Sequence, residues 1–432
     1  MILAKNHPRQ SSGNKRRFVN QVVPLLLMFV VLLNLQGCAF IEDLFGKKED
    51  TTRQVDREKI KDAEVKEVEW EDQTKEEEVV REYPDQLEEE KEFYDVLCFL
   101  PFNGSNRQKG RDLYAGLKMA ANEYAGDLKL RFTTFDVEKL RSEPNVVRKL
   151  LATPEFDMII APYGTSDVNQ VVEMAKGSGA TILSPWNTSA SVERFDRYVQ
   201  INPGIESHFR QIASFTQRKF GEARTLIIGA RKDAPSVKMI QKISPGIDVF
   251  YTSNDPKEDY EVMKDLIASK NIRSVIIPSW RSADESYFLS LLSALNSARD
   301  DQTLNVFLLA SWMNNDKIQY EQLRGMNLHF TSSRFLDYMR GPIQRFDDSY
   351  YRKFNYFPSE DVLYGHDLFL IASGLFSKYG FRISDQIVNF DCQDCLFRYD
   401  FVDQVDENGN SFILNDHVDI VSWKDYEYRR VN

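Results

Sequence analysis

Short apolar runs alternate with amphipathic segments through residues 93–432, and this alternation limits the possible folds more than any other feature of the chain. Residues 96–102 are almost wholly apolar, which is typical of a buried strand. From Leu113 to Tyr124, apolar residues recur three and four positions apart, which predicts an amphipathic helix. Repeated strand and helix units predict parallel sheets covered by helices. The units form two series of about 110 and about 130 residues, so we expect two lobes.

Each series can be read element by element. In the first, we expect further strands at residues 128–135, 156–161 and 181–183, and helices over residues 146–151 and 168–175. In the second, strands are expected at residues 225–229, 247–251, 275–277, 306–310 and 328–331, with helices over residues 237–243, 260–269, 286–298 and 318–324. The expected fold class is therefore α/β, with two lobes that are each built on a parallel sheet flanked by helices.

The N-terminus has the pattern of a secretory signal, because five basic residues precede residue 18 and residues 22–35 are almost wholly apolar. The sequence Leu35-Gln36-Gly37-Cys38 resembles the lipobox of bacterial lipoproteins. This resemblance implies that residues 1–37 are removed and that Cys38 is acylated. The apolar run is shorter than the roughly 20 residues of a bilayer span, and two or more acyl chains anchor a protein stably. We therefore expect a lipid anchor at Cys38; an uncleaved membrane anchor is the alternative.

An acidic segment follows the lipobox. Residues 39–92 contain 21 Asp and Glu against 10 Lys and Arg, and no apolar stripe recurs at helical spacing for several turns. Such a segment buries too little apolar surface to offset the entropy lost on ordering. We interpret residues 38–92 as the lipidated cysteine and a solvated linker that holds the folded domain away from the membrane. An acidic arm that binds a partner is the alternative interpretation.

The remaining cysteines leave several possibilities open. Cys98 lies in a strand-like run, and Cys392 and Cys395 form a CxxC motif without a second CxxC or paired histidines nearby. A zinc site usually needs four such ligands. A local structural disulfide between Cys392 and Cys395 is the favoured interpretation, with free thiols, redox chemistry and metal binding as alternatives. We expect no metal site and no cofactor.

A series of short motifs follows a fixed order through residues 93–432. The motifs are Gly110-Arg111-Asp112-Leu113-Tyr114-Ala115-Gly116, Phe135-Asp136, Gly164-Thr165-Ser166, Leu183-Ser184-Pro185-Trp186-Asn187-Thr188, Tyr198-Val199-Gln200-Ile201-Asn202-Pro203 and Tyr364-Gly365-His366-Asp367. Together they resemble the type I periplasmic solute-binding proteins, the leucine-binding and receptor-ligand-domain family. The resemblance implies lobe one over residues 93–202 and 332–397, lobe two over residues 203–331, a hinge between them, and a C-terminal hairpin over residues 398–432. Lipoprotein activators of penicillin-binding proteins have a similar fold.

The resemblance also implies a ligand site at the loops that follow the strands. In lobe one, the candidate residues are Thr165, Ser166, Trp186, Asn187 and Thr188. Ser166 would cap the following helix, whose N-terminus favours a carboxylate, and Thr188 falls where amino-acid binders carry a ligand-contacting hydroxyl. The alternative is that Ser166 only caps its helix and that Thr188 only fixes a turn.

Lobe two is expected to contribute Trp280, Arg281 and Trp312, which follow predicted strands and would point aromatic faces and a cation toward the cleft. Interdomain packing of either tryptophan is the alternative. Amino-acid binders usually pair the ligand ammonium with an acidic residue of this lobe. Asp233 and Asp316 are the candidates here, without further support.

These features predict a lipid-anchored extracytoplasmic protein that binds a small polar solute, such as an amino acid, as the substrate-binding component of an ABC importer. The alternative is a cell-envelope interaction protein that activates a peptidoglycan synthase and has no transport role. The sequence has none of the Gly-x-Ser-x-Gly, His-Glu-x-x-His, Walker or Gly-x-Gly-x-x-Gly motifs, so we do not expect an enzyme. The formal charge of −11 disfavours nucleic acid as a partner. Ala39 at the position after Cys38 favours the outer over the inner membrane.

Overall fold

The computed structural model describes residues 91, 93–124, 130–152, 156–380, 383–424 and 427–431. The predicted signal peptide, Cys38 and all of the predicted linker except Lys91 lie outside the described residues. Leu87–Asn432 form one compact unit. Among the helices described in it, none has the length and apolar character needed to cross a bilayer.

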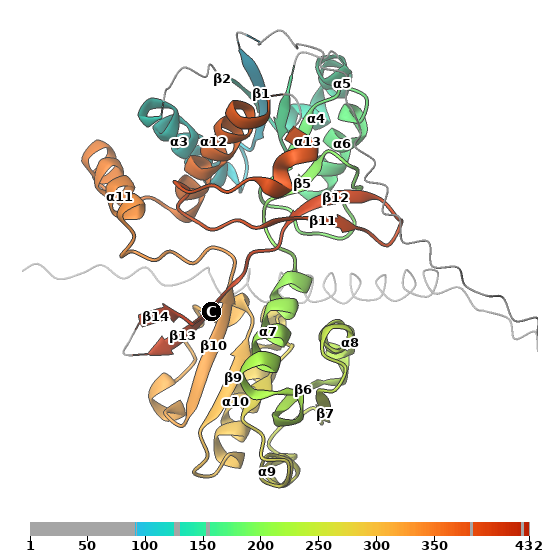
Figure 1. Ribbon diagram of the computed structural model, residues 1–432, viewed down its shortest axis with the longest axis vertical. Coiled ribbons are helices and arrows are strands. Elements are labelled where there is room, and N and C mark those ends of the chain that lie inside the picture. Colours follow the sequence, from blue (N-terminus) through green and yellow to red (C-terminus); the bar gives the residue numbers. More distant parts are fainter. Residues whose placement is uncertain are drawn as a thin grey trace, which may run out of the picture. The chain divides into compact units, whose positions relative to one another are not determined.

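One half of this unit, lobe one, is built on a seven-stranded sheet (Figure 1). Its strands in spatial order are β11 (Phe401–Val405), β12 (Ser411–Asn415), β5 (Tyr198–Gln200), β4 (Thr181–Ser184), β3 (Met158–Ile160), β1 (Tyr94–Leu100) and β2 (Leu130–Asp136). β1 to β5 and β12 run parallel, and β11 is antiparallel to β12. Every residue of β3, β4 and β5 is buried, as expected for central parallel strands covered on both faces.

The other half, lobe two, is built on a second seven-stranded sheet. Its order is β14 (Glu427–Arg430), β13 (Asp419–Lys424), β10 (Met326–Ser332), β9 (Leu304–Leu308), β8 (Ser274–Ile276), β6 (Thr225–Ala230) and β7 (Asp248–Thr252). β6 to β10 are parallel, whereas β13 and β14 are antiparallel to their neighbours. The parallel strands of the two lobes have the same spatial order, β2-β1-β3-β4-β5 and β7-β6-β8-β9-β10. The predicted α/β fold with two lobes is confirmed.

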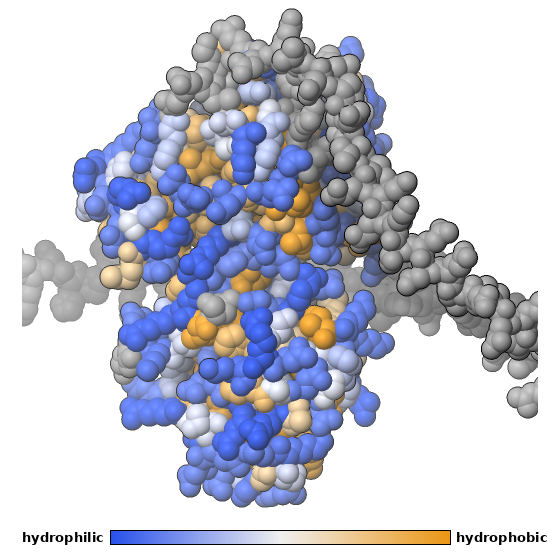
Figure 2. All heavy atoms as spheres, in the orientation of Figure 1, coloured by the Kyte–Doolittle hydropathy of each residue, from blue (hydrophilic) through white to orange (hydrophobic). Residues whose placement is uncertain are grey.

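Helices cover both faces of each sheet, because each helix has one apolar face that must be buried. In lobe one, α3 (Arg107–Glu123), α11 (Gly341–Phe354), α12 (Glu360–Tyr379) and α13 (Ile383–Gln386) bury one face. The helices α4 (Glu138–Ser142), α5 (Pro144–Ala152) and α6 (Thr165–Ala175) bury the other. In lobe two, α9 (Tyr260–Ser269) and α10 (Glu285–Ala298) lie opposite α7 (Ile205–Phe220) and α8 (Ala234–Ile243). On the side seen in Figure 2, hydrophilic residues predominate and hydrophobic ones gather in small groups.

Two expected elements differ from the structure. The helix expected over residues 318–324 is only a short 3-10 turn, Tyr320–Leu323. Ile318 and Leu323 are buried in the core of lobe two, so the apolar spacing reflects a packed loop. The hairpin expected over residues 398–432 is instead two hairpins, since β11 and β12 join the first sheet and β13 and β14 join the second. The chain therefore passes between the lobes a third time.

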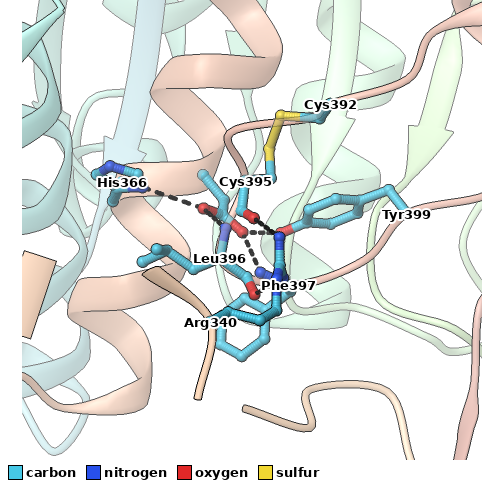
Figure 3. The surroundings of a disulfide bond; sticks show 8 residues. Arg340, His366, Cys392, Cys395, Leu396, Phe397 and Tyr399 are labelled. Atoms are coloured by element: carbon cyan, nitrogen blue, oxygen red, sulfur yellow. Dashed lines mark hydrogen bonds and ion pairs between the residues drawn. A yellow bond between two sulfur atoms is a disulfide. The ribbon is translucent and has the colours of Figure 1, made fainter. Parts of the chain in front are cut away.

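A buried aspartate fixes the segment before β11. Asp367 of α12 is fully buried and accepts hydrogen bonds from the backbone N–H groups of Leu396 at 2.8 Å and Phe397 at 2.9 Å, and from the Tyr399 hydroxyl at 3.1 Å (Figure 3). The disulfide between Cys392 and Cys395 closes the turn just before these residues. A buried carboxylate is stable only when hydrogen bonds replace its hydration. Asp367 therefore fastens the C-terminal segment to the core of lobe one.

Candidate ligand-binding cleft

A cleft of about 1080 Å³ lies between the lobes, and both lobes and the segments that connect them line it. Its volume slightly exceeds the range of about 300–1,000 Å³ that is typical of small-molecule pockets. The lining residues are Lys109, Tyr163, Trp186, Asn202, Ala310, Met313, Asn314, Ser332, Ser333, Arg334, Phe335, Leu336, Asp337, Tyr338, Met339, Glu360, Glu427, Tyr428, Arg429 and Arg430.

The topology explains why these residues meet. Tyr163 follows β3, Trp186 follows β4, and Met313 follows β9, so all three lie beyond the carboxyl ends of parallel strands. Open α/β sheets bind ligands at that edge. The edges of the two lobes face each other across the segments that connect them.

Hydrogen bonds tie these connecting segments together. The Ser333 hydroxyl donates to the Asn202 side chain at 3.2 Å, and the Asn415 amide donates to the carbonyl of Ile201 at 2.9 Å. The third connection runs from β12 to β13, and its Asp416 forms an ion pair of 2.6 Å with Arg210 of α7. All three passages of the chain between the lobes are thus side by side, which is the arrangement of a hinge.

Aromatic side chains form the lobe-one wall. Trp186 is 8% exposed and lies edge-on to Tyr163, with ring centroids 5.8 Å apart. The Trp186 indole N–H donates to Asp361 at 3.1 Å, which fixes the orientation of the ring. The Lys109 ammonium lies 4.6 Å from the centroid of the Tyr163 ring. The wall therefore combines an aromatic surface with a cation at its rim.

Arg334 forms the centre of the hinge side. Its guanidinium lies 4.1 Å from the centroid of the Tyr364 ring and pairs with Glu360 at 2.8 Å. Burial by itself would lower the pKa of Arg334, but Tyr364 and Glu360 outweigh it and the net pKa is raised. Burial also raises the pKa of Tyr364, whose hydroxyl donates to the carbonyl of Pro185 at 2.8 Å. Arg334 is therefore a fixed positive charge that already has a partner.

The charges of the cleft are not all compensated. Arg430 pairs with Asp419 at 2.5 Å, and Arg429 pairs with Glu427. In contrast, no carboxylate in the described part of the chain pairs with Lys109, whose ammonium contacts only Tyr163. Asp337 accepts the backbone N–H of Met339 at 3.1 Å and has no basic partner within the described ranges. Among the described residues, the cleft thus presents one cation, Lys109, and one anion, Asp337, that the charges of a ligand can pair with.

The lobe-one residues predicted from sequence lie at or beside the cleft. Trp186 lines it. The Asn187 amide donates to the Thr165 hydroxyl at 2.9 Å, so these two residues hold the loops after β3 and β4 together. Ser166 and Thr188 are exposed and are not among the lining residues. The predicted cap by Ser166 is wrong, because Gly164 occupies the N-cap position of α6 and no side chain caps it.

The predicted lobe-two residues lie away from the cleft lining. Trp312 is buried in the core, stacked on Phe288 with ring centroids 4.0 Å apart, and donates to the carbonyl of Ser279 at 2.7 Å. Trp280 is 43% exposed, and Arg281 lies against its ring at 5.6 Å. Trp312 therefore packs inside lobe two, neither pointing into the cleft nor packing between the lobes.

The two acidic candidates of lobe two are not cleft residues either. Asp233 is buried, accepts the backbone N–H of Ala230 at 3.0 Å, and has its pKa raised chiefly by burial. Asp316 is exposed. Among the described residues, the cleft acid without a basic partner is instead Asp337, in the connection between β10 and α11.

Sequence reasoning missed Lys109, Asp337 and the whole of β14. Lys109 stands just before the Gly110 motif, so its place at the start of the first helix was a usable signal. Trp423, Tyr428 and Arg430 lie five and two positions apart, so they do not form the strict alternation that would have indicated the hairpin of β13 and β14. Nothing in the sequence shows that this hairpin reaches the cleft.

Neither a metal-binding cluster nor a reactive thiol is present among the described residues. No cluster of three or more potential metal ligands occurs in the part of the chain that the structure describes. Cys98 is fully buried, and burial raises the pKa of its thiol, so it is not a reactive thiolate.

No protein-family model matches the sequence, and no curated protein is similar to it in sequence. Solved structures are similar in fold. An ABC transporter substrate-binding protein from Desulfitobacterium hafniense in complex with Leu is 16% identical, with a TM-score of 0.50 and coverage of 78% of this chain and 99% of the other. A second structure of an ABC transporter substrate-binding protein from that organism is 15% identical, with a TM-score of 0.53 and the same coverage.

A third similar structure is the C-domain of LpoA (YraM) from Haemophilus influenzae, described as a regulator of PBP1A. It is 13% identical, with a TM-score of 0.53 and coverage of 78% of this chain and 100% of the other. These identities are low, so the similarities concern the fold alone. The chain has the two-lobed fold of the type I periplasmic binding proteins.

Proposed function

We propose that this chain is a membrane-anchored extracytoplasmic protein that binds a small polar solute, of the amino-acid type, in the cleft between its lobes. The observation that carries the proposal is the pair of uncompensated charges in that cleft. Lys109 has no carboxylate partner and Asp337 has no basic partner among the residues described, and both line the same cavity. A zwitterion would supply both missing partners.

The surroundings of these charges suit such a ligand. Trp186 and Tyr163 offer apolar surface next to Lys109, and the hinge side offers the Asn202 amide and the Ser332 hydroxyl. Small-molecule sites usually combine apolar walls with a few polar groups that fix orientation. We expect the ligand carboxylate at Lys109 and the ligand ammonium at Asp337.

Membrane attachment is proposed on sequence grounds. The lipobox-like Leu35-Gln36-Gly37-Cys38 and the acidic segment after it favour a lipid anchor on a long linker. A role as the substrate-binding component of an importer is consistent with the fold that the chain shares with proteins of ABC transporters. We propose the outer membrane as the anchoring site because Ala39 follows Cys38.

Isothermal titration calorimetry with a panel of free amino acids tests the solute-binding proposal. The Lys109→Ala variant should bind the best ligand about ten- to a hundredfold more weakly, because a charge-assisted hydrogen bond is lost. Lys118→Ala is the matched control, since Lys118 is exposed on the same helix and does not line the cleft. An equal loss of affinity in Lys109→Ala and Lys118→Ala would contradict the proposal. A wild-type chain that binds no amino acid would contradict it as well.

A role in the cell envelope is the second candidate, and an exposed aromatic surface at the end of α11 favours it. Tyr351 is 45% exposed and Phe357 is 70% exposed, with ring centroids 5.1 Å apart. Aromatic residues are enriched at protein interfaces. In this role the domain would contact a peptidoglycan synthase and transport nothing.

Binding to a purified peptidoglycan synthase of the same cell separates the two candidates. The envelope role predicts that Tyr351→Ser with Phe357→Ser abolishes binding and that Lys109→Ala leaves it intact. A wild-type chain that does not bind the synthase would exclude this role.

A further inference from the structure

The last strand of the lobe-two sheet has one edge that no described strand pairs with, and this edge lies in the cleft. β14 is the terminal strand in the order β14-β13-β10-β9-β8-β6-β7, and no described strand pairs with its other side. All four of its residues, Glu427 to Arg430, line the cleft. Alternate side chains of a strand point to opposite faces, so four consecutive side chains do not lie on one face. The four residues share only the edge of the strand, and this edge therefore lines the cleft.

The register shows which backbone groups this edge presents. β14 pairs with β13 in antiparallel register, with Arg430 opposite Val421 and Tyr428 opposite Trp423. The N–H of Val431 donates to the carbonyl of Ile420 at 2.9 Å, so residue 431 points its peptide groups toward β13. In an antiparallel pair this direction alternates from residue to residue. The N–H and C=O groups of Tyr428 and Arg430 therefore point away from β13.

We propose that the cleft binds an extended peptide with a free C-terminal carboxylate, which adds to β14 as a further strand. This proposal rests on the proposed solute-binding function and specifies its ligand class. Main-chain hydrogen bonds to Tyr428 and Arg430 would hold the peptide backbone, as in other cases of strand addition. The uncompensated ammonium of Lys109 would hold the carboxylate.

The size and walls of the cleft leave room for a ligand that is longer than a single amino acid. A cleft of about 1080 Å³ is larger than a typical small-molecule pocket of about 300–1,000 Å³. Aromatic rings stand along it, from Tyr163 and Trp186 in lobe one to Phe335 and Tyr338 in the hinge connection, so alternate peptide side chains would meet apolar surface. Tyr338 is 59% exposed, which leaves its ring available to a ligand.

The side chains of β14 itself are already engaged, which limits the peptide to backbone contacts there. Arg430 pairs with Asp419 and lies 5.4 Å from the centroid of the Phe335 ring, while the Tyr428 hydroxyl lies 3.1 Å from that of Tyr320. Recognition at β14 would thus tolerate different peptide sequences, with specificity set by the aromatic walls.

Calorimetry on the full chain in detergent, with tetra-alanine as the probe, tests this proposal. Three further probes carry one N-methyl group, on the amide nitrogen of residue 2, 3 or 4. In an added strand, only alternate amide N–H groups of the peptide bond to β14. The affinity should therefore fall about tenfold either for the probe methylated at residue 3 alone, or for each of the two probes methylated at residue 2 and at residue 4. Equal affinity for all three N-methyl probes, or an equal loss in all three, would overturn strand addition.

A second measurement tests the carboxylate contact. Tetra-alanine should bind the wild type about tenfold more tightly than its C-terminal amide does, and Lys109→Ala should remove this difference while Lys118→Ala keeps it. The same preference in the wild type and in Lys109→Ala would overturn the contact. If free amino acids bind and tetra-alanine does not, the peptide proposal falls and the solute-binding proposal stands. If neither binds, both fall.

Discussion

Gly116 of α3 and Gly365 of α12 are reciprocal contact points, each set against the backbone of the other helix. A Cβ on Gly116 would lie 1.9 Å from the carbonyl oxygen of Val362, and a Cβ on Gly365 would lie 2.0 Å from that of Leu113. Neither backbone can yield as a flexible side chain could. The two helices therefore cross at a distance that only glycine permits at both positions.

Gly365→Ala tests this close crossing. We expect destabilisation of about 3 kcal/mol, because overpacking forces the helices apart, and a fall in melting temperature of several degrees. Gly177→Ala is the matched control, since a Cβ there would meet nothing within 4 Å. Equal melting temperatures for the two variants in a thermal denaturation experiment would contradict the account of the crossing.

Two histidines whose rings lie largely out of solvent, His208 and His329, predict loss of stability in acid. Burial lowers the pKa of His208 from 6.5 to about 4, and it does the same for His329, whose ring stacks on Phe307. Between pH 6.5 and pH 4 the unfolded chain therefore binds protons that the folded chain does not. Stability should fall by about 2 kcal/mol or more over that range and be fully present above it.

Urea denaturation of the full chain from pH 7 to pH 4 measures this loss. A double variant, His208→Gln with His329→Gln, should show a flatter pH dependence than the wild type, because glutamine does not titrate. An unchanged slope would show that other groups control the acid response.

The anchor prediction concerns Cys38. We expect Cys38→Ser to abolish metabolic labelling with a radioactive fatty acid and to leave an unprocessed precursor, because serine offers no thiol for acylation. Cys98→Ser is the control, since Cys98 is buried in β1 and should leave labelling unchanged. Normal labelling of the Cys38 variant would refute the anchor.

Alanine substitutions test whether the ligand contacts Ser166 and Thr188, as the sequence predicts, or only the residues that line the cleft. If Ser166 and Thr188 bound the ligand carboxylate, Ser166→Ala and Thr188→Ala would each weaken binding about ten- to a hundredfold. Both residues are exposed outside the lining, so we expect their variants to bind within about twofold of the wild type. Titration of each variant with the same amino acid decides between these outcomes.

Much of the fold was predictable because local apolar patterns decide it. The buried run at β1 and the periodic apolar residues of α3 are read directly from the chain. The spacing of Ile318 and Leu323 misled, because a loop packed into a core shows the same apolar residues as a short helix. The second C-terminal hairpin was missed because pairing with β10 depends on contacts across the lobe.

The candidate site was predicted less completely, for a physical reason. Trp186 was found because it follows a strand, and strand ends meet at the cleft. Trp312 also follows a strand, yet its ring turns inward onto Phe288, a choice that side-chain packing makes and local sequence does not reveal. Asp337 belongs to a connection without periodic pattern, so only the three-dimensional structure brings it to Lys109's cavity.

Native mass spectrometry of the full chain, purified in detergent from cells that make it, tests ligand binding in the cleft most directly. Ligand binding in the cleft predicts a small-molecule adduct on the wild type and on Lys118→Ala, and a much weaker adduct on Lys109→Ala and on Asp337→Asn. The same adduct on all four proteins, or bare protein throughout, would contradict it.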